Sequence, residues 1–239
     1  MLYFRGCVVR EKLPNISHAT EKILKEAGID YSLLDNEACC GSFLMRTGFK
    51  TEAEDVMKST LQDILATNEK TILVSCAGCY NTLKNDYKSL FGVELDVIHT
   101  SELLKELIAE GKLKVKPTEK TLTYHDPCHL GRHSGIYDEP RDAIKTIGEL
   151  VEMKRNRERS RCCGAGSGVK SAFPELALNV AKKRIQDADE VDAEILVTSC
   201  SFCMLNLDNA LEKLKNNEKN GSVVSVMDIT ELILMGMER

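Results

Sequence analysis

Residues 160–166 read SRCCGAG and residues 37–42 read EACCGS, so a cysteine pair followed by glycine occurs twice in the chain. A second repeated motif follows each pair, VSCAGC at 74–79 and TSCSFC at 198–203. One further cysteine precedes each pair, at Cys7 and at Cys128. Equivalent cysteines are offset by 121, 123 and 124 residues. Self-similarity at one long period indicates a duplicated unit.

The duplication sets the expected domain organisation. Between the two sets of motifs lies the polar stretch EGKLKVKPTEK (110–120), whose one glycine and one proline are typical of a linker. We therefore expect a first domain over residues 1–115 and a second over residues 116–239.

Short runs rich in Val, Ile and Tyr come before each cysteine group and are typical of strands. The expected strands are 2–4, 31–34, 71–74 and 94–98 in the first half, and 121–124, 150–153, 194–197 and 223–226 in the second. Apolar residues at helical spacing predict helices between them, at 53–65, 80–90, 103–108 and 204–214. Strands that alternate with helices predict an α/β fold of two pseudo-symmetric Rossmann-like βα repeats with parallel sheets.

The cysteines follow the expected strands, and this has a geometric consequence. The carboxyl ends of parallel strands share one edge of the sheet, where ligands bind in open α/β folds. We therefore expect the thiols of each half to gather at that edge, close to the interface between the halves.

Ten cysteines in 239 residues are too few for a disulfide-rich miniprotein. The N-terminus MLYFRGCVV lacks a signal-peptide pattern, which favours reduced thiols that serve as ligands or redox groups. Structural disulfides fit poorly, since adjacent cysteines form strained bridges and five thiols per half leave one unpaired. Two zinc sites are a further alternative, but one zinc ion takes four ligands. An iron–sulfur cluster is larger, so adjacent cysteines can reach different irons, and we favour it.

Composition limits the other function classes. The formal net charge is −5, which argues against nucleic-acid binding. No apolar run approaches the roughly 20 residues of a membrane helix. We expect a cytoplasmic protein, associated with a membrane only through a partner.

Each half reads Cys-x31–33-Cys-Cys-x35–36-Cys-x-x-Cys, and this pattern resembles the cysteine-rich CCG domain of heterodisulfide reductases. The resemblance is closest in YHDPCHLGR (124–132), RCCGAGSGVKSAFPEL (161–176) and TSCSFC (198–203). It implies that each half binds a noncubane [4Fe-4S] cluster, and that the two clusters face one another across a pseudo-two-fold axis. The implied ligands are Cys7, Cys39, Cys40, Cys76 and Cys79 for the first cluster and Cys128, Cys162, Cys163, Cys200 and Cys203 for the second.

The resemblance also implies an activity. In the reductases, the coenzyme M–coenzyme B heterodisulfide is cleaved reductively, and we expect one electron from each cluster, with each product sulfur held transiently on an iron. The alternative is an electron-transfer iron–sulfur subunit of a flavoprotein-linked complex of the lactate or glycolate oxidation type. Both halves retain all five cysteines, which favours the first reading.

The chain departs from the large catalytic chain of the reductases, since it has no Cys-x2-Cys-x2-Cys-x3-Cys-Pro segment. We therefore expect another polypeptide, a ferredoxin-like iron–sulfur subunit or a flavoprotein, to supply electrons. A membrane cytochrome subunit is a more distant partner that the resemblance allows. The expected substrate is a small-molecule disulfide, with no nucleic acid involved.

Several other residues are candidates for the site. Arg132 and Arg161 are candidates for binding an anionic substrate, as is Arg46, although the basic segment 154–161 is more typical of a solvated loop or a docking patch for an acidic partner. His129 is the candidate proton donor, or a hydrogen-bond donor to a cluster sulfur. Gly41 and Gly164 suit a close approach of the backbone to a bulky cofactor. His125, with Asp126, is expected to fix the turn before Pro127.

Overall fold

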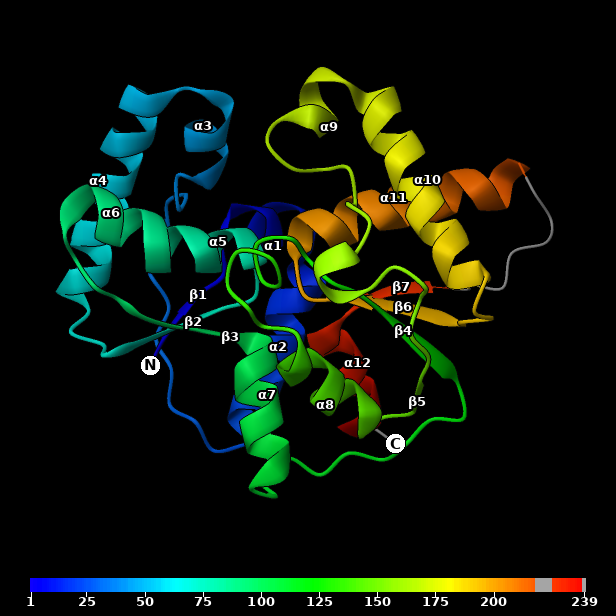
Figure 1. Cartoon of the computed structure of the whole chain (residues 1–239). Helices are drawn as coiled ribbons and strands as arrows, with labels where there is room; N and C mark the ends of the chain where they lie inside the picture. Colours follow the sequence, from blue (N-terminus) through cyan, green and yellow to red (C-terminus); the bar gives the residue numbers. More distant parts are fainter. Residues whose placement is uncertain (218–224, 238–239) are drawn as a thin grey trace.

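The chain folds into two α/β halves, each built on a parallel sheet (Figure 1). The structure is a computed structural model and describes residues 1–217 and 225–237. The first sheet has the order β1-β2-β3, and the second has the order β5-β4-β6-β7. The strands are β1 (Leu2–Phe4), β2 (Thr71–Val74), β3 (Asp96–His99), β4 (Thr121–His125), β5 (Glu149–Leu150), β6 (Ile195–Thr198) and β7 (Ser225–Asp228). The expected fold class is confirmed.

The stretch at 31–34 is not a strand, which corrects the prediction from its composition. It makes a single parallel bridge, between Leu2 and Ser32, and the chain then turns away. Its counterpart β5 is also short, with two residues paired to β4. Both segments lie at a sheet edge, where a strand has a neighbour on one side only. Edge strands are often very short. Residues 223 and 224 of the last expected strand lie outside the described residues.

Helices connect the strands and cover the sheets. In the first half they are α1 (Cys7–Lys12), α2 (Pro14–Glu26), α3 (Ser42–Thr47), α4 (Lys50–Ala66), α5 (Ala77–Asn81), a π-helix (Thr82–Asp86), α6 (Tyr87–Phe91) and α7 (Thr100–Ala109). In the second half they are α8 (Asp138–Lys145), a 3-10 turn (Arg157–Arg159), α9 (Val169–Ala172), α10 (Pro174–Asp189), α11 (Ser201–Asn217) and α12 (Ile229–Met237). Within the described ranges, no helix has both the length and the apolar character needed to cross a membrane.

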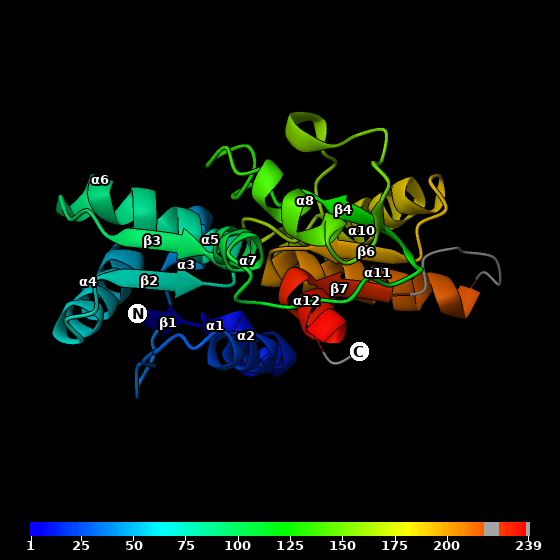
Figure 2. The same ribbon diagram turned by 90° about the horizontal axis from the view of Figure 1, so that it is seen from below.

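The two halves share a buried core. Helix α2 packs against α12, and α7 packs against α8, so helices of the two halves meet in two pairs (Figures 1 and 2). Apolar side chains from both sheets fill the space between these helices, among them Tyr3, Leu73, Tyr124 and Val197. The connecting segment at 110–120 also contributes, because Leu113 is buried in the same core. A division into domains at residues 115 and 116 stays a prediction.

This arrangement positions the site. The strands of the first sheet run toward the boundary between the halves (Figure 2). The 31–34 segment is the counterpart of β5, and each is the second segment of its half in chain order. The first and third segments, β1 and β2 in one half and β4 and β6 in the other, then lie side by side in each sheet. That is the point where an open parallel sheet reverses its winding and where ligands bind. Both cysteine-bearing edges therefore face one region.

Candidate metal centre

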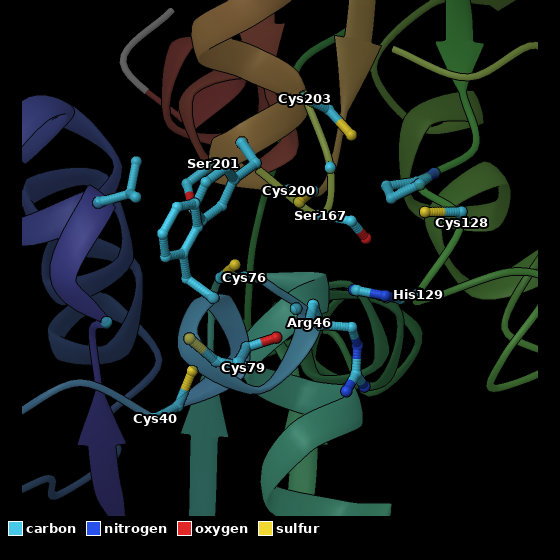
Figure 3. Close-up of a pocket in the computed structure, with 18 of the residues that line it drawn as sticks. Cys40, Arg46, Cys76, Cys79, Cys128, His129, Ser167, Cys200, Ser201 and Cys203 are labelled. Atoms are coloured by element: carbon cyan, nitrogen blue, oxygen red, sulfur yellow. The ribbon is translucent and has the colours of Figure 1, made fainter. Parts of the chain in front are cut away.

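All ten cysteines line one cavity between the halves. Figure 3 labels Cys40, Cys76, Cys79, Cys128, Cys200 and Cys203 among its lining residues. The cavity holds about 810 Å³ of space free of protein atoms, part of it open to solvent. Its other lining residues include Ser42, Arg46, His129, Ser167 and Ser201. The ten cysteines are all free thiols within the described residues. The expected convergence of the cysteine groups at the strand ends is therefore what the structure shows.

In the first half, three loops bring the thiols together. Cys7 begins α1 directly after β1, and its Sγ lies 3.8 Å from that of Cys39. Cys76 is the N-cap of α5, and Cys79 lies in the first turn of that helix. Gly6, which sequence reasoning missed, has a φ of 81° and leaves no room for a side chain, because a Cβ there would lie 2.9 Å from the Sγ of Cys79.

The second half repeats this arrangement. Cys128 lies in the turn after β4, and Cys200 directly precedes α11, which carries Cys203 in its first turn. Cys162 and Cys163 are adjacent in the loop before α9. Four of the five thiols are at least partly buried, and Cys162 is the exposed one.

The thiols hydrogen-bond to one another and thereby change each other's acidity. Hydrogen bonds from Cys40 and then Cys7 lower the pKa of Cys39 to about 3. A hydrogen bond from Cys200, in the other half, is the largest cause that lowers the pKa of Cys76 well below its usual range. Thiols packed this closely cannot all ionise unless a cation compensates their charge. The donor set therefore fits a metal group that binds many thiolates.

The two glycines that follow the cysteine pairs have a structural role. Gly41 and Gly164 have φ values of 84° and 86°, a region that favours glycine. Their amides donate to sulfur, at 3.4 Å to Cys39 Sγ and 3.3 Å to Cys162 Sγ. Neither glycine lines the cavity, whereas Gly6, Gly78 and Gly166 do. The lack of a side chain at both positions is explained by packing against α4 and α10. Any role of Gly41 and Gly164 at the cofactor would therefore be through their amide hydrogen bonds to sulfur.

The candidate arginines separate into two groups. Arg46 lines the cavity, and its Nη2 lies 2.8 Å from Asp86 Oδ2. Arg132 donates to the carbonyl oxygen of Ser160 at 2.9 Å, and Arg161 forms two hydrogen bonds to Asp187. Neither Arg132 nor Arg161 is among the described residues that line the cavity.

The three histidines near Cys128 also differ. His129 lines the cavity, and burial is the main cause that lowers the pKa of its imidazole. His133 is exposed and meets the His129 ring edge-on at 5.1 Å between centroids. His125 is buried beside the second thiol set, while Asp126 holds the loop by accepting from the amide of Arg157. The turn role expected for His125 and Asp126 therefore falls to Asp126.

Sequence reasoning missed two buried arginines, Arg141 and Arg184. Arg141 pairs with Asp126 at 2.6 Å and with Glu152 at 2.6 Å. Arg184 donates to His125 Nδ1 at 3.1 Å. One signal was available, because Arg184 lies on the apolar face of α10 with Ala181 and Ile185, where a charge needs a buried partner.

Two parallel sheets whose cysteine-bearing edges share one cavity define a duplicated α/β protein with a thiol-lined metal centre. A family model described as a cysteine-rich domain, CCG, matches residues 1–84 and 122–208. The chain belongs to this family, and the resemblance in the motifs is confirmed.

Three curated relatives cover nearly the whole chain. The chain is 39% identical to one subunit of the dihydromethanophenazine:CoB–CoM heterodisulfide reductase of Methanosarcina acetivorans, over 99% of this chain and 59% of the relative. It is 38% identical to one subunit of the fumarate reductase (CoM/CoB) of Methanothermobacter marburgensis, over 98% of this chain and 45% of the relative. It is 33% identical to the EtfAB:quinone oxidoreductase of Syntrophomonas wolfei, over 99% and 34% respectively. The chain thus spans a third to three fifths of these relatives.

Among solved structures, a hypothetical protein from Helicobacter pylori has a similar fold. The TM-score is 0.57 at 11% identity, over 100% of this chain and 49% of that one. At this identity the likeness supports the fold alone.

Proposed function

We propose that the chain is the catalytic iron–sulfur part of an oxidoreductase complex that reductively cleaves a small-molecule disulfide. The proposed substrate is the coenzyme M–coenzyme B heterodisulfide or a similar compound. The observation that carries the proposal is the single cavity lined by all ten cysteines. The similarity to a heterodisulfide reductase over 99% of the chain supports it.

The cofactors in this proposal are two [4Fe-4S] clusters, of the noncubane type. Cys7, Cys39, Cys40, Cys76 and Cys79 would hold the first, and Cys128, Cys162, Cys163, Cys200 and Cys203 would hold the second. When bound, the clusters supply the two electrons of the reduction, one from each half. Five donors in each half, none used in a disulfide, fit a group that needs more thiolates than one metal ion does.

The residues around the cavity would bind and orient the substrate. Reduction of a disulfide consumes two electrons and two protons and releases two thiols. Among the described residues, Arg46 is the one arginine or lysine that lines the cavity, so it is our first choice for holding an anionic group of the substrate. Arg132 and Arg161, outside the lining, remain weaker candidates for the same role.

His129 is the proposed proton donor. It lines the cavity next to Cys128, and burial and then the charge of Arg46 lower the pKa of its ring. The neutral imidazole carries one N–H, which can hydrogen-bond to sulfur, and the ring can give a proton to a leaving thiolate only from its protonated form. The proton lost in this way would return from solvent through the open side of the cavity.

The alternative is an electron-transfer iron–sulfur subunit of a flavoprotein-linked complex. The similarity to an EtfAB:quinone oxidoreductase favours this second reading. In either case we propose that a ferredoxin-like iron–sulfur protein or a flavoprotein supplies electrons, with a membrane cytochrome as a more distant partner. A cytoplasmic location, with membrane association through such a partner, stays a prediction.

One experiment separates the two readings. Anaerobically reconstituted chain should hold about eight irons, four for each five-cysteine set. With reduced viologen as donor, added heterodisulfide should then oxidise viologen and release thiols in a ratio of about two per disulfide. Intact clusters without any viologen oxidation would remove the enzyme reading. Electron transfer from a reduced flavoprotein to a quinone by the same material would favour the alternative.

A further inference from the structure

His125 is a buried imidazole at a position where the first half has an apolar side chain. It ends β4 and pairs with Thr198 of β6, as Phe4 ends β1 and pairs with Val74 of β2. Val74 and Thr198 each stand two residues before a Cys-x-x-Cys motif. Phe4 and His125 are therefore structurally equivalent, and both are buried. An apolar ring in one half is replaced by a hydrogen-bonding ring in the other.

The imidazole lies against the second cysteine set. A ring nitrogen of His125 and the Sγ atoms of Cys163 and Cys203 all lie within 4.8 Å of one another. Of these two thiols, Cys163 is the one whose acidity the ring changes. The ring is therefore close enough either to bind a metal or to donate a hydrogen bond to a ligand sulfur.

Arg184 on α10 decides between these two roles. Its Nε donates to His125 Nδ1 at 3.1 Å, and a guanidinium has no acceptor atom. Nδ1 therefore carries the lone pair, and the proton of the neutral ring is on Nε2. A ring that accepts at Nδ1 is the neutral form, so the contact with Arg184 itself fixes the tautomer. A nitrogen that carries a proton cannot ligate iron.

The arginine is itself fixed in place. Arg184 is 0% exposed. Its Nη1 donates to the carbonyl oxygen of Arg155 at 2.8 Å and to Asp187 at 3.2 Å. These contacts hold the guanidinium in the orientation that aims Nε at the imidazole.

The first half lacks this partner as well. The backbone oxygens of Ala53 and Ala177 face the glycine that follows each cysteine pair, so α4 and α10 are equivalent helices. Seven residues further along, Thr60 occupies the position of Arg184. The Thr60 hydroxyl donates to the carbonyl oxygen of Cys39 at 2.9 Å and brings no charge. The two thiol sets thus lie in different electrostatic surroundings.

We infer that His125 donates a hydrogen bond from Nε2 to the Cys163 thiolate and raises the reduction potential of the second cluster above that of the first. This inference rests on the proposed function. A hydrogen bond to a ligand sulfur stabilises the reduced, more negative cluster, and the phenyl ring of Phe4 offers none. Electrons that enter the chain then reside first in the second half, which makes two similar halves unequal.

Two substitutions and one labelled sample test this inference. His125→Phe installs the residue of the first half, and His125→Gln keeps an N–H donor. In the full, anaerobically reconstituted chain, potentials are measured by redox titration followed by EPR, with iron counted in each sample. We expect His125→Phe to keep its iron and to change the oxidised-to-reduced ratio of the second cluster about tenfold or more, which is 59 mV for one electron. We expect the first cluster to be unchanged in both variants and His125→Gln to stay close to wild type.

The controls separate the possible failures. His18→Phe changes an exposed histidine on α2 and should alter neither potential. Pulsed EPR of wild-type protein with ¹⁵N-labelled histidine needs no variant, and a strong coupling typical of a bound nitrogen would overturn the inference. Full iron with an unchanged potential in His125→Phe would also overturn it. A wild-type chain that holds no clusters would instead remove the proposed function.

Discussion

The thiol of Cys200 is the largest cause that lowers the pKa of Cys76, although the two residues belong to different halves. Cys76 is the N-cap of α5, and Cys200 directly precedes α11. They are equivalent positions of the duplicated unit, 124 residues apart in sequence. Their contact shows that the two sulfur sets form one continuous surface, which a disulfide bound between them would touch on both sides.

This contact predicts a specific cross-link. Mild oxidation of iron-free, reduced chain with diamide should join Cys76 to Cys200, because the low pKa of Cys76 makes it the attacking thiolate and Cys200 is its neighbour. Mass spectrometry of an unreduced digest measures the linked peptides. Cys200→Ser should abolish this link, and cluster-loaded chain should resist it. Links confined to pairs within one half, such as Cys7 with Cys39, would contradict the arrangement.

The cysteine spacing was enough to predict much of this fold. Each cysteine group follows a strand or strand-like segment, and parallel strands bring such residues to one edge, so convergence followed from local patterns and topology. The edge segment at 31–34 was overpredicted, since β-propensity cannot show that a segment has only one neighbour to pair with.

The surroundings of the sulfur atoms could not be predicted. Arg184 reaches His125 across 59 residues, and no local pattern specifies that contact. The sequence places Arg161 in a basic segment, but Asp187, on α10, accepts two hydrogen bonds from it. Side-chain pairing of this kind depends on the packing of α10 against the loop before it, which periodicity does not encode.

A second prediction concerns pH and stability. Burial raises the pKa of Asp228 from 3.8 to about 7, and its Oδ2 has no partner. Below pH 3.8 both the folded and unfolded states are protonated, so the site costs nothing. Between about pH 4 and 7 the unfolded chain ionises first, so stability falls with rising pH and stays lower above 7.

Asp228→Asn should therefore raise the free energy of unfolding at pH 8, by up to about 4 kcal/mol, and have little effect near pH 4. Asn keeps the oxygen that accepts from the Thr230 amide at the start of α12. Urea unfolding at both pH values measures the difference. Asp35→Asn, at an exposed position, is the matched control and should change stability little at either pH. An equal gain for Asp228→Asn at both pH values would contradict the role of ionisation.

A third prediction compares the two glycines after the cysteine pairs. A Cβ at Gly164 would lie 2.5 Å from the backbone oxygen of Ala177, whereas one at Gly41 would lie 2.3 Å from Cγ of Met57, a flexible side chain. Both positions have positive φ. We expect Gly164→Ala to cost about 2 kcal/mol or more and Gly41→Ala closer to 1 kcal/mol.

Urea unfolding of the two variants tests this order. Gly166→Ala is the control within the same loop, because a Cβ there would meet nothing within 4 Å. It should change the free energy of unfolding by less than about 0.5 kcal/mol. A larger cost for Gly41→Ala than for Gly164→Ala would show that Met57 cannot move aside.

The fourth prediction compares two candidate arginines, Arg46, which lines the cavity, and Arg132, which does not. Arg46→Gln removes a cation from the cavity, while Arg132→Gln removes one that donates to the carbonyl oxygen of Ser160 outside the lining. If an anionic disulfide is the substrate, Arg46→Gln should raise its KM about tenfold or more, since a hydrogen bond to a charged group contributes about 1.5–3 kcal/mol.

Arg132→Gln should change KM less than threefold, and the clusters of both variants should be fully loaded when iron is counted. An uncharged aryl disulfide supplies the second readout, because its KM should not respond to Arg46→Gln. The reverse order, with Arg132 governing KM for the anionic disulfide, would place substrate binding on the loop around Ser160. Asp86 Oδ2 lies 2.8 Å from Arg46 Nη2 and offsets part of its positive charge. Asp86→Asn should therefore lower KM for the anionic disulfide if Arg46 binds it.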